Sequence, residues 1–303
     1  MTHIFPRHSK LNAPVAVGGE GIYLIDSTGK RYLDGSGGAA VSCLGHGDAE
    51  ITAAIKAQLD QLAFAHTGFF TSEPAEKLAD LLIDHAPGDL DRVYFVSGGS
   101  EAVESAVKLA RQYAVTVGQG SRWKVISRNP SYHGSTLGAL ALTGYAPLSD
   151  PFAPMMKMMP KIPAPRAYLD GLPMDDPATG AHYAAMLEAK ILEEGPETVL
   201  AFIQEPIGGA STGALVPPAG YMQAVREICD RYGVLLIHDE VMSGGGRTGK
   251  FMGAEHFGVD PDIIAISKGF GAGYAPLGAM IARDGLINTV LDAGGFLHGH
   301  TYA

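Results

Sequence analysis

The chain has very little cysteine. Only Cys43 and Cys229 occur among its 303 residues, far apart and without the spacing of a metal-binding pair. This excludes a disulfide-stapled scaffold and suits a reducing compartment. The start, MTHIFPRHSK, lacks the apolar core of a signal peptide, and no apolar run approaches ~18 residues. We therefore expect a cytoplasmic protein with no membrane partner.

Basic clusters are also missing. The chain has 22 lysines and arginines against 32 aspartates and glutamates, for a net charge of -10. Nucleic acids and anionic membrane surfaces are therefore not expected partners. Hydrophobic residues make up 46% of the chain, which indicates a globular fold. Glycine is abundant, with 40 residues, and predicts many tight turns and close backbone approaches.

The pattern of apolar residues predicts an α/β fold, with a mainly parallel central sheet covered by helices on both faces. We expect short buried strands at residues 92–97, 123–127, 199–205, 234–240 and 263–267. Amphipathic helices are expected between them at 100–114, 182–193 and 220–232. Residues 145–177 are rich in proline and methionine, and we expect an irregular segment there.

The two ends of the chain differ from this pattern. Alternating residues around an Asp-Ser-Thr-Gly turn predict a β-hairpin at 21–35, and helical spacing follows at 48–62 and 72–83. The last residues, GHTYA, are not followed by the helix that would complete the final strand–helix unit. We expect an N-terminal part at 1–60 and a large domain at 61–303, in a chain that has been cut short.

Ligands of an open α/β sheet bind outside the carboxyl ends of its strands, and polar groups collect there in this chain. After the strand at 92–97 comes Ser-Gly-Gly-Ser, with Ser100 at the N-cap of the next helix. Free amides at such a helix start bind anions, phosphate above all, although an ordinary capped turn has the same sequence. Tyr132 and His133, beyond the strand at 123–127, offer a flat face for a planar ligand or form a packed loop.

Charged residues end three further strands. Glu205 ends the strand at 199–205, Asp239 and Glu240 end the next one, and Lys268 follows the strand at 263–267. A carboxylate at the end of a buried strand needs a partner, which could be a protonated ring nitrogen, a metal or a hydrogen-bonded turn. A lysine held and partly desolvated there becomes a nucleophile; a solvated surface lysine is the alternative.

Several other classes of site fit less well. The stretch GGGRTG matches the dinucleotide fingerprint G-x-G-x-x-G, which would suggest a nicotinamide or flavin oxidoreductase, but no helical pattern follows it. The acidic residues and His238 lack the spacing of a zinc site, so no metal is expected. No G-x-S-x-G elbow of a serine hydrolase occurs. The groups present match the needs of pyridoxal phosphate: amides, an aromatic face, a carboxylate and a lysine amine.

The chain also resembles the class III, omega-type aminotransferases, which are fold-type I pyridoxal-phosphate enzymes. The resemblance rests on SGGSEAVESAVKLAR, YHGST, QEPIGGASTGALVPPAGY, LLIHDEVMSGGGRTG, PDIIAISKG and PLGA, in that order. It implies a seven-stranded large domain, a small domain built from both chain ends, and a homodimer with active sites at the interface. It also implies pyridoxal 5'-phosphate as cofactor and a ping-pong reaction. An omega-amino acid, diamine or amine would donate the amino group to a keto acid such as pyruvate or 2-oxoglutarate.

The resemblance assigns catalytic roles to two residues. Lys268 would form the Schiff base with the cofactor and move the substrate proton. Asp239 would keep the ring nitrogen protonated. The remaining cofactor and substrate positions are Gly99 and Ser100 at the phosphate, Tyr132 and Val241 on the two faces of the ring, Thr301 at the phosphate of the neighbouring subunit, and Glu205 beside the substrate.

The chain departs from the family in two places. Met242 stands where many relatives carry a glutamine that touches the ring hydroxyl. The chain also stops before the C-terminal half of the small domain and the usual substrate-carboxylate arginine. Two alternatives to transamination therefore stay open: an aminomutase, decarboxylase or racemase on the same fold, and a catalytically silent fragment.

Overall fold

A computed structural model of the protein describes residues 3–5 and 13–303. The chain divides into two compact units, Met1–Ala63 and Phe64–Ala303. The first unit contains an antiparallel sheet of β1 (Ala16–Glu20), β2 (Tyr23–Asp26) and β3 (Arg31–Leu33), followed by the short α1 (Gly37–Ala40) and by α2 (Ala49–Gln61). The hairpin expected at 21–35 is confirmed as β2 and β3, whereas β1 was not predicted.

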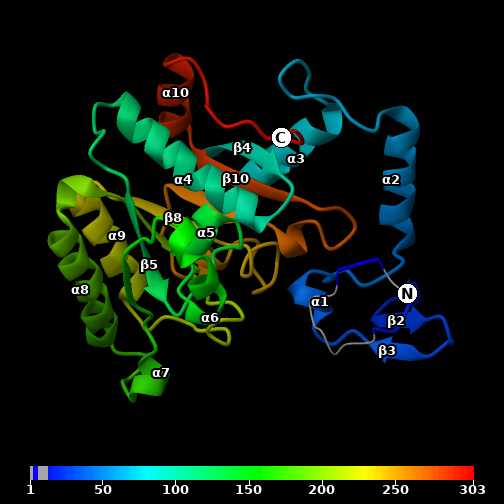
Figure 1. The fold of residues 1–303 in the computed structure, drawn as a ribbon, viewed down its shortest axis with the longest axis horizontal. Coiled ribbons are helices and arrows are strands. Elements are labelled where there is room, and N and C mark those ends of the chain that lie inside the picture. Colours follow the sequence, from blue (N-terminus) through cyan, green and yellow to red (C-terminus); the bar gives the residue numbers. More distant parts are fainter. Residues whose placement is uncertain (1–2, 6–12) are drawn as a thin grey trace. The chain divides into compact units, whose positions relative to one another are not determined.

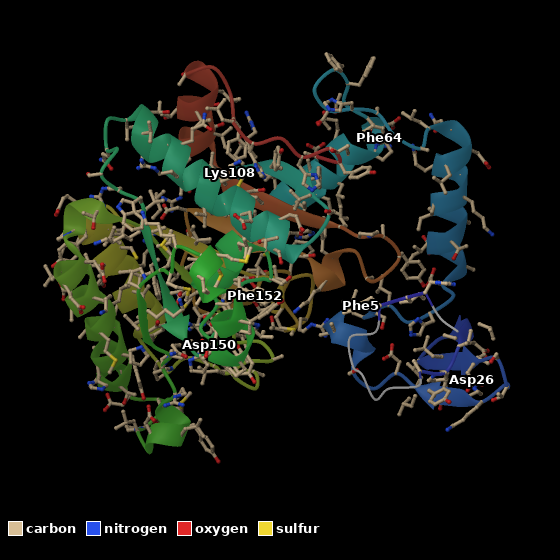
Figure 2. All side chains as sticks on the ribbon, in the orientation of Figure 1. Phe5, Asp26, Phe64, Lys108, Asp150 and Phe152 are labelled. Atoms are coloured by element: carbon tan, nitrogen blue, oxygen red, sulfur yellow. The ribbon has the colours of Figure 1, made fainter. Side chains whose placement is uncertain are left out.

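Asp26 fixes the turn of this hairpin (Figure 2). Its carboxylate accepts hydrogen bonds from the backbone and hydroxyl of Thr28, from the backbone of Lys30 and from the hydroxyl of Tyr32. The side-chain hydrogen bonds from Thr28 and Tyr32 lower the pKa of Asp26 to about 2. The turn that the sequence predicts is thus held by one carboxylate.

The second unit is built on a seven-stranded sheet (Figure 1). Its order is β4 (Leu90–Val96), β10 (Gly278–Arg283), β9 (Ile263–Ile266), β8 (Leu235–Asp239), β7 (Val199–Gln204), β5 (Lys124–Asn129) and β6 (Lys161–Pro163). β10 runs antiparallel to both its neighbours, while the remaining pairs are parallel. The predicted α/β fold with a mainly parallel sheet is therefore confirmed, with β6 and β10 added.

Helices cover both faces of this sheet because successive strand residues point to opposite sides. In β7, Ala201 and Ile203 pack in the hydrophobic cluster that includes residues of α4 (Gly99–Thr116) and α10 (Asp284–Asp292). Phe202 between them packs with α8 (Pro177–Glu194) and α9 (Tyr221–Tyr232) on the opposite face. Leu82 of α3 (Glu73–Asp84) packs on Ile264 and Ile266 of β9.

The segment at 145–177 is more regular than expected. It contains α6 (Ala146–Ser149), β6 and α7 (Ala167–Asp170), and it follows α5 (Leu137–Leu142). The expectation of an irregular excursion is therefore wrong for these short elements, whose apolar residues Ile162 and Ala167 join the core. In the described part of the chain, no helix combines the length and the apolar character needed to cross a membrane.

The antiparallel β10 begins at the edge where the parallel strands end. Gly278 pairs with Val96 at the end of β4. A Cβ atom at Gly278 would lie 2.7 Å from the carbonyl oxygen of Gly98, which is backbone and cannot rotate away. The glycine in the PLGA motif thus lets β10 approach the turn that leads into α4.

We predict that Gly278→Ala destabilises the protein by about 1–3 kcal/mol, because the added methyl group collides with backbone. Urea unfolding measures this loss. Gly285→Ala is the matched control, because Gly285 lies in α10 and a methyl group added there would meet no atom within 4 Å. The control should be neutral or slightly stabilising. Equal effects of the two replacements would contradict the assigned contact.

Candidate active site

The start of α4 lies against the residue that follows Glu240. A Cβ atom at Gly99 would come within 2.8 Å of Cγ1 of Val241. The first amides of an α-helix have no partner within the helix, and here they begin an 18-residue helix directly behind Ser97 and Gly98. The glycine therefore brings a helix N-terminus, with its anion-binding amides, to the end of β8.

The loop after β5 closes on the same helix start. The hydroxyl oxygen of Ser100 accepts a hydrogen bond of 3.0 Å from the backbone N–H of Ser135. A Cβ atom at Gly134, whose φ is +136°, would lie 2.7 Å from this oxygen. Glu104 accepts hydrogen bonds from the hydroxyl of Thr136 and the backbone of Ala139. Ser100 thus accepts from the loop and keeps its own O–H available to donate.

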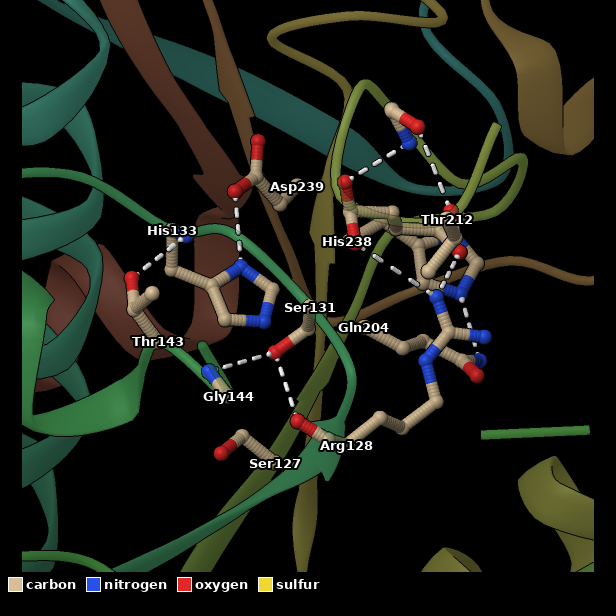
Figure 3. A network of polar contacts seen from close by, with 12 residues as sticks. Ser127, Arg128, Ser131, His133, Thr143, Gly144, Gln204, Thr212, His238 and Asp239 are labelled. Atoms are coloured by element: carbon tan, nitrogen blue, oxygen red, sulfur yellow. Dashed lines mark hydrogen bonds and ion pairs between the residues drawn. The ribbon is translucent and has the colours of Figure 1, made fainter. Parts of the chain in front are cut away.

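Asp239 is buried at the end of β8 and bonds to a histidine (Figure 3). It is 3% exposed. One carboxylate oxygen, Oδ2, lies 2.8 Å from Nδ1 of the buried His133, and Oδ1 accepts from the backbone of Val241 at 3.1 Å. The backbone of His133 donates to the hydroxyl of Thr143 at 2.9 Å, which fixes the loop. Nδ1 of His133 is therefore the donor to the carboxylate, and the buried Nε2 has no hydrogen-bond partner among the described residues.

From the sequence, His133 is expected to be packed or hydrogen-bonded, and the structure adds the identity of its partner. The two residues of the pair are 106 positions apart. The available signal was that His133 and Asp239 each follow or end a strand of the same parallel sheet, so that both belong to one edge.

Lys268 occupies the turn after β9, in η4 (Lys268–Phe270). Its φ of +52° lies in the left-handed region, which is uncommon for a residue with a side chain. Its carbonyl oxygen accepts from the backbones of Gly271 and Ala272, which holds this turn. Burial lowers the pKa of Lys268; the negative charges of Asp239 and Glu205 oppose this shift, and Arg247 adds to it. The amine is thus partly desolvated and within the field of both carboxylates.

Glu205 is the second buried carboxylate at this edge and is 3% exposed. Its Oε1 accepts from the backbone of Gly209 at 2.8 Å. Arg128, near the end of β5, donates from Nη2 to the carbonyl oxygen of Glu205 at 2.6 Å. The same nitrogen lies 3.9 Å from Oε2 of the carboxylate. Sequence reasoning did not identify Arg128, because its position in the strand gives no indication of a charged partner.

Glu240 has a different role from Asp239. Its buried carboxylate accepts from the hydroxyl of Ser243 and from the backbones of Gly253 and Ala254. Burial raises the pKa of Glu240. This residue therefore anchors the glycine-rich turn, which is followed by the four-residue 3-10 helix η3 (Gly253–His256) and not by the helix of a dinucleotide site.

The two remaining candidates are more exposed. Tyr132, next to His133, is 36% exposed. Thr301 lies in the exposed C-terminal segment, where the neighbouring His300 approaches the hydroxyl of Ser97 at 3.3 Å. The structure therefore places Gly99, and with it the neighbouring Ser100, at Val241. The backbone of Val241 in turn donates a hydrogen bond to Asp239. The negative charges of Asp239 and Glu205 act on Lys268 and raise its pKa against the effect of burial.

Comparison with known proteins gives a consistent result. The family described as aminotransferase class-III matches residues 5–303. An uncharacterized aminotransferase of Bacillus subtilis, YodT, is 43% identical over 96% of this chain and 65% of its own length. The putrescine–pyruvate aminotransferase of Pseudomonas aeruginosa is 37% identical over 99% of the chain and 66% of its own length.

Solved structures agree with these sequence matches. An (S)-enantioselective omega-transaminase from Thermomicrobium roseum superposes with a TM-score of 0.93 at 40% identity, over 99% of this chain and 68% of that protein. The omega-transaminase of Pseudomonas jessenii in complex with PMP gives a TM-score of 0.91 at 32% identity, over the same shares of the two chains. The chain belongs to the class III aminotransferases, a pyridoxal-phosphate-dependent family, and its fold is that of the fold-type I transaminases. It spans about two thirds of the length of the relatives it matches.

The C-terminal segment is attached to α4 through His298. Lys108, labelled in Figure 2, approaches Nδ1 of His298 at 2.8 Å, and Ser105 approaches Nε2 at 3.0 Å. The hydroxyl of Ser105 donates to the carbonyl of Glu101, so it accepts from the ring. The Lys108 contact therefore requires an unprotonated Nδ1 and hence a neutral His298 ring. Burial, with the charges of Lys108 and His300, lowers the pKa of His298, against the raising effect of Glu104.

We predict that His298 makes the protein less stable at acid pH. Its folded-state pKa lies below the unfolded value of about 6.5, so its contribution is present above that pH and is lost as the pH falls through the folded pKa. Unfolding in urea at pH 7.5 and 5.5 should show a larger acid loss for the wild type than for His298→Asn. Lys108→Gln should reduce the same loss. An identical pH dependence in all three proteins would contradict the assignment.

Proposed function

We propose that this edge of the sheet binds pyridoxal 5'-phosphate, and that the whole protein transfers an amino group from an amine donor to a keto acid by a ping-pong mechanism. The observation that carries the proposal is the buried pair of Asp239 and His133 in the electrostatic field of the partly desolvated Lys268. Family membership supports it independently.

The residues present fit this cofactor. The first amides of α4 and the hydroxyl of Ser100 would hold the phosphate, because the Ser100 oxygen already accepts from Ser135 and its proton is free to donate. Asp239 would bind the ring nitrogen through the acceptor capacity that His133 and Val241 leave open. Lys268 would hold the aldehyde carbon.

Three further positions complete the proposed site. Tyr132 and Val241 would pack on the two faces of the ring, and the absence of a side chain at Gly99 leaves Val241 in place at the helix start. Thr301 would contact the phosphate bound by the neighbouring subunit. These roles follow the family pattern, residue by residue, and are part of the proposal.

Each residue then has a defined task. Bound pyridoxal phosphate supplies an electron-withdrawing ring that acidifies the C–H bond of the amine donor. Asp239 holds the proton on the ring nitrogen, and His133 keeps the carboxylate in one orientation through Nδ1. Lys268 takes and returns the substrate proton, because burial brings its pKa closer to neutrality than that of a solvated lysine.

The donor would be an omega-amino acid, a diamine or a simple amine, and the acceptor a keto acid such as pyruvate or 2-oxoglutarate. Relatives named for putrescine and pyruvate, for diaminobutyrate and 2-oxoglutarate, and for taurine and pyruvate are 35% to 38% identical to this chain. Glu205 supports a donor with a second positive charge, since its buried Oε2 has no hydrogen-bond partner among the described residues.

We also propose a cytoplasmic homodimer whose sites lie at the interface, with residues 1–60 as part of a small domain and 61–303 as the large one. Apolar side chains support an interface: Phe152 is 45% exposed and Met155 is 67% exposed. Met155 lines a hollow of about 240 Å³ between α4 and α5. Sedimentation of the purified protein measures the oligomeric state. Cys43 and Cys229 are not joined to each other by a disulfide, which suits a reducing compartment.

The decisive experiment locates the lysine that binds the cofactor. Pyridoxal phosphate should give the wild type a visible absorption band, and borohydride reduction followed by peptide mapping should find the adduct on Lys268. Lys268→Ala should lose both the band and the mapped adduct, and the exposed Lys250→Ala is the matched control that keeps them. An adduct scattered over surface lysines would contradict the proposal.

Product analysis then separates the possible reactions. A transaminase consumes a stoichiometric amount of keto acid and bleaches its band with the amine donor alone. An aminomutase, decarboxylase or racemase turns over without a keto acid. Turnover without any keto acid would therefore be compatible with the proposed cofactor site but would contradict the proposed transamination.

A further inference from the structure

Arg128 is a buried cation beside the proposed site. It is 1% exposed, in the strand β5. Its Nη2 atom donates to the carbonyl oxygen of Glu205 at 2.6 Å and lies 3.9 Å from Oε2 of the same residue. Its Nε atom has no hydrogen-bond partner in the described part of the chain. A buried guanidinium stays charged because its pKa is too high for deprotonation, so it requires a compensating anion.

The other groups packed around Arg128 do not supply that anion. Gln204 of β7 is neutral. Burial and the charges of Arg226 and Arg128 lower the pKa of His238 to about 3, so this ring is neutral near pH 7. Burial raises the pKa of Tyr221 on α9, so its phenol keeps its proton. The positive charge of Arg128 therefore acts mainly on the Glu205 carboxylate.

Glu205 itself is hydrogen-bonded at one carboxylate oxygen and has no hydrogen-bond partner at the other among the described residues. Gly209 donates to Oε1 at 2.8 Å. The buried Oε2 has the Arg128 nitrogen at 3.9 Å, beyond hydrogen-bond distance, and has no hydrogen-bond partner in the described residues. On the site side, Glu205 and Asp239 raise the pKa of Lys268, and the charge of Arg247 lowers it. A buried carboxylate oxygen without a hydrogen-bond partner forms a strong, charge-assisted hydrogen bond with a cationic group.

We infer that Arg128 is a positioning residue that fixes the backbone and the carboxylate of Glu205, so that Oε2 can receive the second ammonium group of a diamine donor. This inference rests on the proposed function of Glu205. In this role Arg128 would act without touching substrate or cofactor. Its effect is transmitted through the charge and orientation of one carboxylate.

The test compares two donors on the whole protein loaded with pyridoxal phosphate. Putrescine carries a second ammonium group, and butylamine has a chain of the same length without it. Arg128→Met should raise the KM for putrescine about tenfold or more near pH 7. The KM and kcat for butylamine should change little. Arg128→Lys should recover most of the loss.

A second pair of variants keeps the inference falsifiable if Arg128→Met folds poorly. Glu205→Gln should show the same loss for putrescine, and adding Arg128→Met to it should cause no further loss. The double variant should also unfold at a higher temperature than Arg128→Met alone, because it leaves no uncompensated carboxylate in the interior.

The outcomes separate the inference from its premise. If Glu205→Gln leaves the KM for putrescine unchanged, the proposed role of Glu205 is wrong and the inference is overturned with it. If Glu205→Gln raises this KM but Arg128→Met does not, the inference alone is wrong. An equal loss for both donors, without recovery in Arg128→Lys, would identify Arg128 as merely structural and would also overturn the inference.

Discussion

The site depends on the burial of one carboxylate at the end of a strand. β8 is enclosed by β7 and β9, and its last residue, Asp239, has lost nearly all contact with solvent. Such a carboxylate is stable only with hydrogen-bond donors, and His133 and Val241 provide them. These two hydrogen bonds hold the loop after β5 and the turn that begins at Val241 against the end of β8. The helix start, the loop and the lysine turn are then arranged around this point.

Backbone geometry makes this arrangement possible. Gly99 allows Val241 to pack on the start of α4, and Gly278 allows β10 to pass the turn before that helix. Lys268 adopts a left-handed φ that a non-glycine residue tolerates only when its surroundings hold it there. The hydrogen bonds to its carbonyl from Gly271 and Ala272 supply that restraint. The amine is thereby held in a buried position close enough to both carboxylates for their charges to act on it.

Much of the fold follows from sequence because fully buried parallel strands are short apolar runs. The strands that end at Gln204, Asp239 and Ile266 are of this kind, and the sequence alone places the charged residues at or just after their ends along one edge of the sheet. β10 was missed because its place between β4 and β9 is decided by tertiary pairing. The partners of Asp239 and Glu205 were missed for the same reason: His133 and Arg128 come from β5 and its loop, and no local pattern connects them with strands so distant in sequence.

The central proposal is that the buried Asp239 would bind the protonated ring nitrogen of pyridoxal phosphate. It is tested most directly by the ¹⁵N chemical shift of pyridoxal phosphate, labelled at the ring nitrogen and bound to the whole protein. We expect the shift of a protonated pyridinium at neutral pH, and the shift of a neutral pyridine in Asp239→Ala. A neutral ring nitrogen in the wild type would contradict the claim.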